Sequence, residues 1–186
     1  MLPLGTRLPA FRLPDLDDRM VSSDDTRDAA ALLVAFICPH CPFVKHVRQE
    51  FARVATEYAS RGLMVVAINS NDIEKFPQDG AEGMREEKRV VGYSFPYLLD
   101  EQQEVAKAFH AACTPDFFLF DAAATLVYRG QFDESRPGNG VPVTGADLRA
   151  ATEAVLNGKP VDAAQKASVG CNIKWKAGNE PSYAAS

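Results

Sequence analysis

An apolar run that passes directly into an amphipathic helix limits the folds open to this chain. Residues 31–37 are almost entirely apolar, a pattern typical of a strand that is buried on both faces. Residues 43–58 then carry apolar side chains at helical spacing, with charged residues between them. Gly62 is placed to end this helix, and residues 63–69 form a second apolar run. We therefore predict a strand, a helix and a parallel strand joined in a right-handed unit.

A C-x-x-C motif, Cys38-Pro39-His40-Cys41, lies where the first strand becomes the helix. A thiol at a helix N-terminus faces unpaired N–H groups and the positive end of the helix dipole, and both favour the thiolate. We expect Pro39 to take the first helical position, with Cys38 as the exposed cap and catalytic nucleophile. Cys41, about one turn in and more covered, is placed to attack a mixed disulfide at Cys38. Pro39 and a protonated His40 would tune the thiol pKa.

A C-x-x-C pair is also found as half of a zinc site, which needs two further ligands. The sequence has no second C-x-x-C and no H-x-x-x-H, so the other ligands would have to converge in space from Cys113, Cys171, His46 or His110. The strand–helix position of the pair and its Pro39 favour redox chemistry over metal binding. We therefore predict neither a metal nor a cofactor.

The composition excludes several classes of partner. The chain has 186 residues, 46% of them hydrophobic, which is enough for one domain with a sizeable core. Its net charge of −5 and its scattered basic residues argue against a nucleic acid or an anionic membrane as partner. The N-terminus has no charged start followed by an apolar stretch, and no segment is long and apolar enough to span a bilayer. We expect a cytoplasmic protein with transient disulfides.

The segments around this unit have different patterns. Residues 1–30, rich in Pro and Asp, predict an N-terminal extension with an edge segment. Residues 70–95 predict an insertion with a helix over 83–91, and the charged run 86–89 is typical of a solvated helix face. We interpret Asp79 as a loop residue that contributes solubility and belongs to a helix cap.

The second half of the chain predicts a hairpin and a last helix. Residues 116–121 and 125–129 are typical of paired strands, and residues 144–156 of an amphipathic helix. We place one domain over residues 1–160. Residues 161–186 form a tail that we expect to dock on the same domain, because it contains the only tryptophan of the chain.

Two motifs and the order of elements carry a resemblance to a known family. They are Cys38-Pro39-His40-Cys41 and Thr114-Pro115 ahead of the predicted hairpin, and the tail string 170–176 extends the match. The chain resembles the thioredoxin fold, in the branch shared by TlpA-like and AhpC/TSA proteins, and is similar there to peroxiredoxin-like proteins of uncharacterised function. This resemblance implies an α/β, three-layer sandwich. A central mixed sheet would carry helices on both faces, with an N-terminal extension and an insertion after the second core strand.

The resemblance also implies a substrate-binding element. Thr114–Pro115 would be a cis peptide facing the cysteine pair, and the Thr114 backbone would pair with an extended substrate segment. Cys113, next to it, has two interpretations: a small buried residue, or a resolving thiol for Cys38. We interpret Cys171 as a residue that packs the tail.

The chain departs from the thioredoxin pattern in two ways. Thioredoxins usually carry a buried carboxylate six residues before the first cysteine, where this chain has Leu32. The proton shuttle for Cys41 is therefore missing or supplied by another residue. The Trp-Cys-Gly-Pro-Cys signature is replaced by Cys-Pro-His-Cys, the centre of the strongly oxidising DsbA proteins. Because a histidine there stabilises the thiolate, we expect a more oxidising centre than that of thioredoxin.

Three functions follow as hypotheses. The favoured one is a thiol–disulfide oxidoreductase that uses the Cys38–Cys41 pair on protein or small-molecule thiols and disulfides, together with an upstream reductase or oxidant. The second is a peroxidase. The peroxiredoxin pattern P-x-x-x-T-x-x-C would make Cys41 peroxidatic, but Val34 and Cys38 hold its proline and threonine places. The third is a non-catalytic metal-binding or adaptor module with Cys38, Cys41 and Cys113 as ligands, and His40 or Cys171 as candidates for a further ligand.

Overall fold

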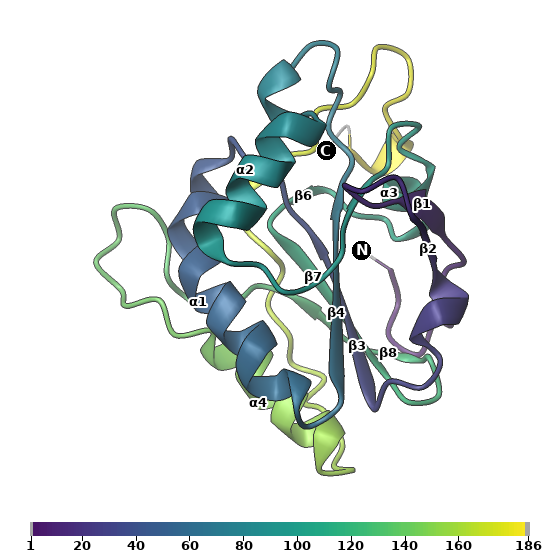
Figure 1. The fold of residues 1–186 in the computed structure, drawn as a ribbon. Helices are drawn as coiled ribbons and strands as arrows, with labels where there is room; N and C mark the ends of the chain where they lie inside the picture. Colours follow the sequence, from purple (N-terminus) through teal and green to yellow (C-terminus); the bar gives the residue numbers. More distant parts are fainter. Residues whose placement is uncertain (1, 185–186) are drawn as a thin grey trace.

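A five-stranded mixed sheet forms the centre of the protein. The structure, a computed structural model, describes residues 2–184 (Figure 1). The strand order is β5-β4-β3-β7-β8; β3, β4 and β5 run parallel, and β7 and β8 are antiparallel to their neighbours. The strands span β3 (Ala31–Phe36), β4 (Leu63–Asn69), β5 (Tyr97–Leu99), β7 (Asp116–Asp121) and β8 (Leu126–Gly130). The predicted parallel unit and hairpin are both confirmed.

Helices cover both faces of this sheet, which confirms the predicted thioredoxin-like sandwich (Figure 1). One face carries three helices: α1 (Pro42–Ala59), α2 (Ala81–Val91) and α4 (Ala146–Leu156). The other carries α3 (Glu104–Ala108) and the N-terminal hairpin of β1 (Arg12–Pro14) and β2 (Met20–Ser22). The part of the chain from residue 2 to 184 also contains three short 3-10 helices: η1 (Ser23–Thr26), η2 (Pro77–Asp79) and η3 (Ser182–Ala184).

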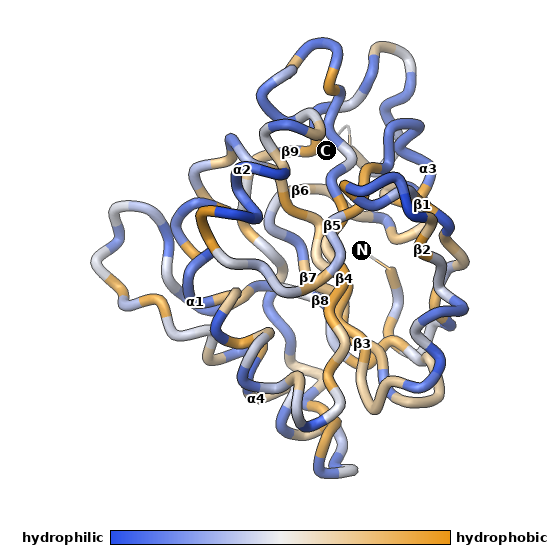
Figure 2. Tube along the Cα trace, in the orientation of Figure 1, coloured by the Kyte–Doolittle hydropathy of each residue, from blue (hydrophilic) through white to orange (hydrophobic). Residues whose placement is uncertain are grey.

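Strand β3 divides its side chains between two hydrophobic cores. Leu33 and Ala35 point toward the core under α1, whereas Val34 and Phe36 point toward the core under α3. All six residues of β3 are buried, as expected for a central strand whose side chains alternate between two covered faces. The hydropathy colouring shows apolar strands in the middle and polar segments around them (Figure 2).

The C-terminal tail returns to the sheet end that carries the cysteine pair. Its strand β9 (Cys171–Asn172) pairs antiparallel with β6 (Cys113–Thr114), and Ile173, directly after it, is buried. Trp175 packs against the core under α3. None of the helices between residues 2 and 184 has the length and apolar character that a membrane span requires.

Candidate active site

The cysteine pair follows the central strand without a linker, as predicted, but the helix begins later than expected. Helix α1 starts at Pro42, and Cys41 is its N-cap residue with φ −63° and ψ 123°. The prediction that Pro39 opens the helix and Cys38 caps it is therefore wrong. Pro42 suits the first helical position, and a residue that precedes a proline avoids the helical region, so Cys41 stays extended.

Both thiols are buried. Cys38 is 1% exposed and Cys41 is 0% exposed, so the prediction of an exposed Cys38 is also wrong. Tail residues 170–172 lie against Thr114 on one side of the pair, and η2 of the insertion supplies a buried side chain on another. These covering segments come from parts of the chain without helical or strand periodicity, so local pattern could not place them.

Thr114 and Pro115 lie beside the pair, and the Thr114–Pro115 peptide is cis, as the resemblance implied. The Cys38 Sγ atom lies 3.5 Å from the Thr114 hydroxyl. The Cys41 Sγ atom lies 3.1 Å from the Thr114 carbonyl oxygen, which can accept a hydrogen bond from the thiol. A single residue therefore contacts both sulfurs, through its side chain and its backbone.

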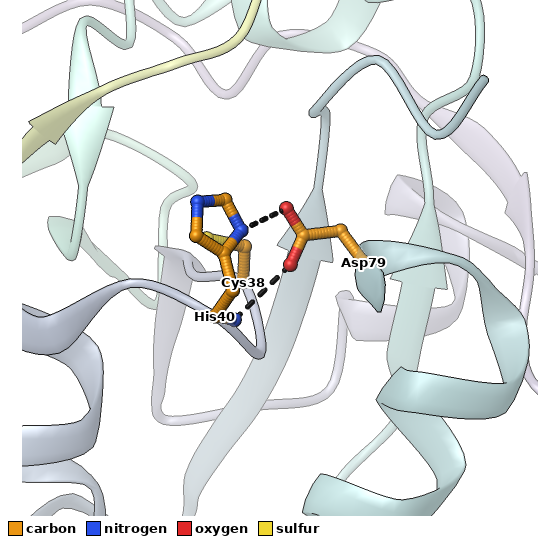
Figure 3. Close-up of side chains that lie close together, drawn as sticks. All are labelled: Cys38, His40 and Asp79. Atoms are coloured by element: carbon orange, nitrogen blue, oxygen red, sulfur yellow. Dashed lines mark hydrogen bonds and ion pairs between the residues drawn. The ribbon is translucent and has the colours of Figure 1, made fainter. Parts of the chain in front are cut away.

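A buried carboxylate, which the sequence reasoning missed, holds the loop between the two cysteines. Asp79 Oδ2 lies 2.5 Å from His40 Nδ1, and Asp79 Oδ1 accepts the His40 backbone N–H at 3.1 Å (Figure 3). Asn71 Nδ2 donates to the same carboxylate at 2.8 Å, and Asn69 Nδ2 donates to the Asp79 carbonyl at 2.6 Å. The Phe76 ring stacks on the His40 ring at a centroid separation of 5.7 Å.

The interpretation of Asp79 as a solubilising loop residue in a helix cap is therefore wrong. Asp79 is 0% exposed, and the N-cap of α2 is Gly80. One signal in the sequence could have pointed to this site. Asn69 and Asn71 lie at or just after the carboxyl end of a parallel strand, the edge at which open α/β sheets place their functional groups.

The hydrogen bonds around the sulfurs separate their pKa values. The bond between the two side chains is the largest effect: it lowers the pKa of Cys41 to about 4, against the opposing effect of burial. A backbone bond from Val44, in the first turn of α1, and a bond to Cys171 lower it further. The same bond to Cys41, then burial and the charge of Asp79, raise the pKa of Cys38. The two pKa values therefore move in opposite directions, downward for Cys41 and upward for Cys38.

A second buried carboxylate, Glu87, lies on α2 close to this site. Tyr97 donates its hydroxyl to Glu87 Oε2 at 3.1 Å, and Arg48 Nη1 lies 3.8 Å from Oε1. Burial raises the pKa of Glu87 to about 7, and the charge of Asp79 adds to the shift. Glu87 is 4% exposed, so the prediction of a solvated helix face over 86–89 is wrong at this residue.

The two remaining cysteines, Cys113 and Cys171, differ in how they are placed relative to the Cys38–Cys41 pair. Cys113 is buried, and its thiol donates to the Pro115 carbonyl oxygen at 3.7 Å. Cys171 is partly exposed, pairs with Thr114 across β6 and β9, and packs against the core that contains Cys38 and Cys41. The resolving role of Cys113 stays a prediction, while Cys171 lies on the strand beside the residue that contacts both sulfurs.

A metal-ligand grouping does occur, with a different composition from the one considered in the sequence. In the described part of the chain, one atom each of Cys38, His40 and Asp79 lie within 4.8 Å of one another. His40 Nδ1 is already engaged by Asp79 at 2.5 Å. The donor set of sulfur, nitrogen and oxygen is chemically suited to zinc, but this short contact leaves no space for an ion between the two ligand atoms.

Comparison with known proteins agrees with this geometry. The profile of the AhpC/TSA family matches residues 4–129. A hypothetical protein from Sinorhizobium meliloti 1021 has a crystal structure with 55% identity, covering 96% of this chain and 97% of its own, with a TM-score of 0.94. An uncharacterized conserved protein from Geobacillus kaustophilus has 54% identity, covers 95% and 94%, and has a TM-score of 0.92.

A more distant structure has the same fold. A putative thiol:disulfide interchange protein DsbE from Chlorobium tepidum has 18% identity, covering 84% of this chain and 99% of its own, with a TM-score of 0.68. No match was found among curated protein sequences. The similar structures therefore support the sheet and helix arrangement described above, and the functional argument depends on the site itself.

Proposed function

Since the chain belongs to the AhpC/TSA family, whose members use thiol-based redox chemistry, we propose that it is a thiol–disulfide oxidoreductase that works through Cys38 and Cys41. The contact of both sulfurs with Thr114, at the N-terminus of α1, is the observation that carries this proposal: Cys38 Sγ lies 3.5 Å from its hydroxyl and Cys41 Sγ lies 3.1 Å from its carbonyl oxygen. This residue positions both sulfurs before any substrate arrives. Its partners would be protein or small-molecule thiols and disulfides, with an upstream reductase or oxidant to reset the pair.

In the reducing direction the two sulfurs act in sequence. Cys38 attacks one sulfur of the substrate disulfide while its proton passes to Cys41, and the first substrate sulfur leaves as a thiolate. Cys41 then attacks Cys38, and its proton goes to the second substrate sulfur as that sulfur leaves. The products are a Cys38–Cys41 disulfide and two substrate sulfurs that have gained two electrons. The lowered pKa of Cys41 favours the second attack.

His40 and Asp79 act in this scheme as positioning residues. Asp79 accepts the backbone N–H of His40 and so holds the loop that separates the cysteines. It also provides a buried carboxylate beside the pair, where the chain lacks the carboxylate that thioredoxins carry at the position of Leu32. The His40 side chain is 25% exposed, which gives protons a route between this carboxylate and the solvent.

The lowered pKa of Cys41 also sets the direction in which the pair works best. A thiol that ionises easily is a good leaving group, so a disulfide made with it is readily reduced and therefore oxidising. We expect a reduction potential above that of thioredoxin, about −270 mV. This agrees with the expectation drawn from the Cys-Pro-His-Cys centre.

Redox titration and insulin reduction on the same sample test the proposal. We expect a disulfide between Cys38 and Cys41 in a glutathione redox buffer, and loss of insulin reduction in Cys38→Ser and in Cys41→Ser. Cys113→Ser addresses the predicted resolving thiol, because unchanged titration and turnover would remove Cys113 from the mechanism. Recovery of Cys38 and Cys41 as free thiols from excess oxidised glutathione would overturn the oxidoreductase assignment.

One observation favours a thiol peroxidase as the second candidate. Cys41, which aligns with the peroxidatic cysteine of peroxiredoxins, is the cysteine with the lowered pKa. Against it, Val34 and Cys38 occupy the places of the peroxiredoxin proline and threonine. Stopped-flow kinetics with hydrogen peroxide separate the two functions: a second-order rate constant no greater than that of free cysteine rules out a dedicated peroxidase.

A further inference from the structure

The tail of the chain occupies the edge at which an incoming substrate strand would pair. Strand β9 aligns Cys171 with Thr114 and Asn172 with Cys113 in an antiparallel register. Extended peptides commonly bind in this way, by adding a strand to a free backbone edge. The chain therefore presents its own cysteine, on its own strand, at the backbone position that the family resemblance assigns to a substrate.

The approach of this strand depends on a glycine. A Cβ atom built on Gly170 would lie 2.1 Å from the Thr114 carbonyl oxygen and 3.2 Å from the Pro115 nitrogen. Real Cβ atoms do not approach backbone atoms this closely, so the absence of a side chain at residue 170 is what allows the contact. Cys171, the next residue, is thereby brought to the cysteine pair.

Contacts after Cys171 hold the tail in this place. Ile173 is 3% exposed and packs into the core under α3. The Lys174 backbone N–H donates to Asn71 Oδ1 at 2.9 Å, and the Lys174 carbonyl accepts the Asp72 N–H at 2.7 Å. Asn71 also donates to Asp79, so one residue holds both the tail and the carboxylate beside the pair. These fixed contacts make the position of the Cys171 thiol a property of the fold.

Three of the cysteines lie around one residue. The Cys41 thiol donates to the Thr114 carbonyl at 3.1 Å, and Cys38 Sγ lies 3.5 Å from the Thr114 hydroxyl, while strand β9 aligns Cys171 with the same residue, so Thr114 is the common neighbour of the three cysteines. Cys171 packs against the same core as the pair while remaining partly exposed. Cys113 is buried and directs its thiol to the Pro115 carbonyl, so it provides a matched cysteine without this contact.

We propose that Cys171 is a third redox thiol that exchanges disulfide partners with Cys41. The proposal rests on the function proposed above, because it starts from the Cys38–Cys41 disulfide. The Cys171 sulfur attacks Cys41, the Cys41–Cys171 bond forms, and the Cys38–Cys41 bond breaks. Cys38 leaves with the bonding electron pair and takes up the proton that Cys171 loses. The chain stays at the same oxidation level, while Cys38 is released as a thiol beside Thr114.

Peptide mapping of oxidised variants tests this exchange. Each variant is oxidised with glutathione disulfide, quenched in acid, unfolded, alkylated and digested with trypsin. Peptide 28–45 then contains both cysteines of the pair, and peptide 167–174 contains Cys171. In Cys38→Ser we expect these two peptides as one cross-linked species, formed independently of protein concentration. The cross-link should persist in Cys38→Ser/Cys113→Ser and vanish in Cys38→Ser/Cys171→Ser.

The result that overturns the proposal is equally specific. In oxidised Cys38→Ser, Cys41 would be recovered as a glutathione adduct while Cys171 is alkylated as a free thiol. Failure of the proposed function gives a different pattern, since peptide 28–45 of the wild-type chain and of Cys171→Ser would then keep two free thiols. A different result is that peptide 28–45 of the wild-type chain has the mass of its reduced form minus two hydrogens, which shows a Cys38–Cys41 disulfide, while Cys38→Ser gives no cross-link. In that case the oxidoreductase proposal stands and only the role of Cys171 is refuted.

Discussion

The imidazole of His40 and the carboxylate of Asp79 meet at 2.5 Å, although the two residues lie 39 positions apart in the chain. Asp79 also accepts the backbone N–H of His40, so its two oxygens contact the side chain and the backbone of one residue. This arrangement ties the 3-10 helix of the insertion to the loop that separates the cysteines. The insertion is therefore part of the site.

Asp79→Asn should make Cys38 easier to ionise. The hydrogen bond to Cys41 and burial raise the pKa of Cys38, and the charge of Asp79 raises it further. Removing that charge is expected to shift the pH profile of Cys38 alkylation to lower pH. The loss of a charged hydrogen-bond acceptor should cost about 1–3 kcal/mol of unfolding free energy.

Asp72→Asn is the matched control for this change. The Asp72 carboxylate accepts the N–H groups of Glu74 and Lys75 at 3.1 and 3.3 Å in the same insertion, whereas His40 is bound by Asp79. Its alkylation profile should match that of the wild type. Identical profiles for Asp79→Asn and the wild type would contradict the assigned effect of Asp79.

Glu87 should make the protein less stable as the pH rises toward neutrality. Its pKa is raised from 4.5 to about 7 in the folded chain. Below pH 4.5 the folded and unfolded states both hold the proton; between that pH and about 7, only the folded state holds it. The unfolding free energy therefore falls through this window, by roughly 3 kcal/mol if the whole shift is realised.

Urea unfolding at pH 5 and pH 8 under reducing conditions measures this dependence. Glu87→Gln should flatten it and gain stability relative to the wild type at pH 8. Glu86→Gln, on the same helix, removes an exposed carboxylate paired with Arg89 and should keep the wild-type dependence. A Glu87→Gln protein with the wild-type pH dependence would show that Glu87 ionises without penalty.

Gly170→Ala should expose the cysteine pair. The new Cβ would meet the Thr114 carbonyl at 2.1 Å, so strand β9 has to move away from β6. If the clash costs 1.4 kcal/mol or more, the uncovered form gains roughly tenfold in population, and alkylation of Cys38 should accelerate by that factor. Val169→Ala changes an exposed neighbouring side chain and should leave the rate unchanged. Equal rates for the two variants would mean that the tail does not limit access.

The purified protein should contain no stoichiometric zinc. An ion between His40 Nδ1 and Asp79 Oδ2 needs those atoms about 3 Å or more apart, and they lie at 2.5 Å. Elemental analysis of protein prepared under reducing conditions checks this. One zinc per chain, with sulfur and nitrogen ligands by X-ray absorption, would contradict the redox interpretation and restore the metal-binding alternative.

The predictable parts of this fold are those with a regular pattern. The alternation in β3 and the helical spacing in α1 depend on burial that repeats every two or 3.6 residues, so their positions could be derived from the sequence. The start of α1 could not, because Pro39 and Pro42 both suit a first helical position. Only the rule that a residue before proline avoids helical geometry separates them, and it favours Pro42.

The missed residues belong to segments placed by tertiary contacts. Asp79 lies in η2, outside the predicted helix of the insertion, and Cys171 lies in a two-residue strand of the tail, so neither residue belongs to a periodic pattern that predicts its approach to the pair. Glu87 is different. It lies three residues after Met84 and four before Val91, on the buried stripe of α2, and this spacing could have predicted its burial.

Strand β3 pairs with β4 and β7 along its whole length, and only Ile37 separates its last residue from Cys38. The Cys38 sulfur thus follows a strand that is hydrogen-bonded on both sides, while the segments around it are held by scattered side-chain and backbone bonds. Relatives of this chain can therefore change which molecules reach the thiol by altering the length and sequence of those outer segments. The position of the Cys38 sulfur would stay the same, because the central sheet determines it.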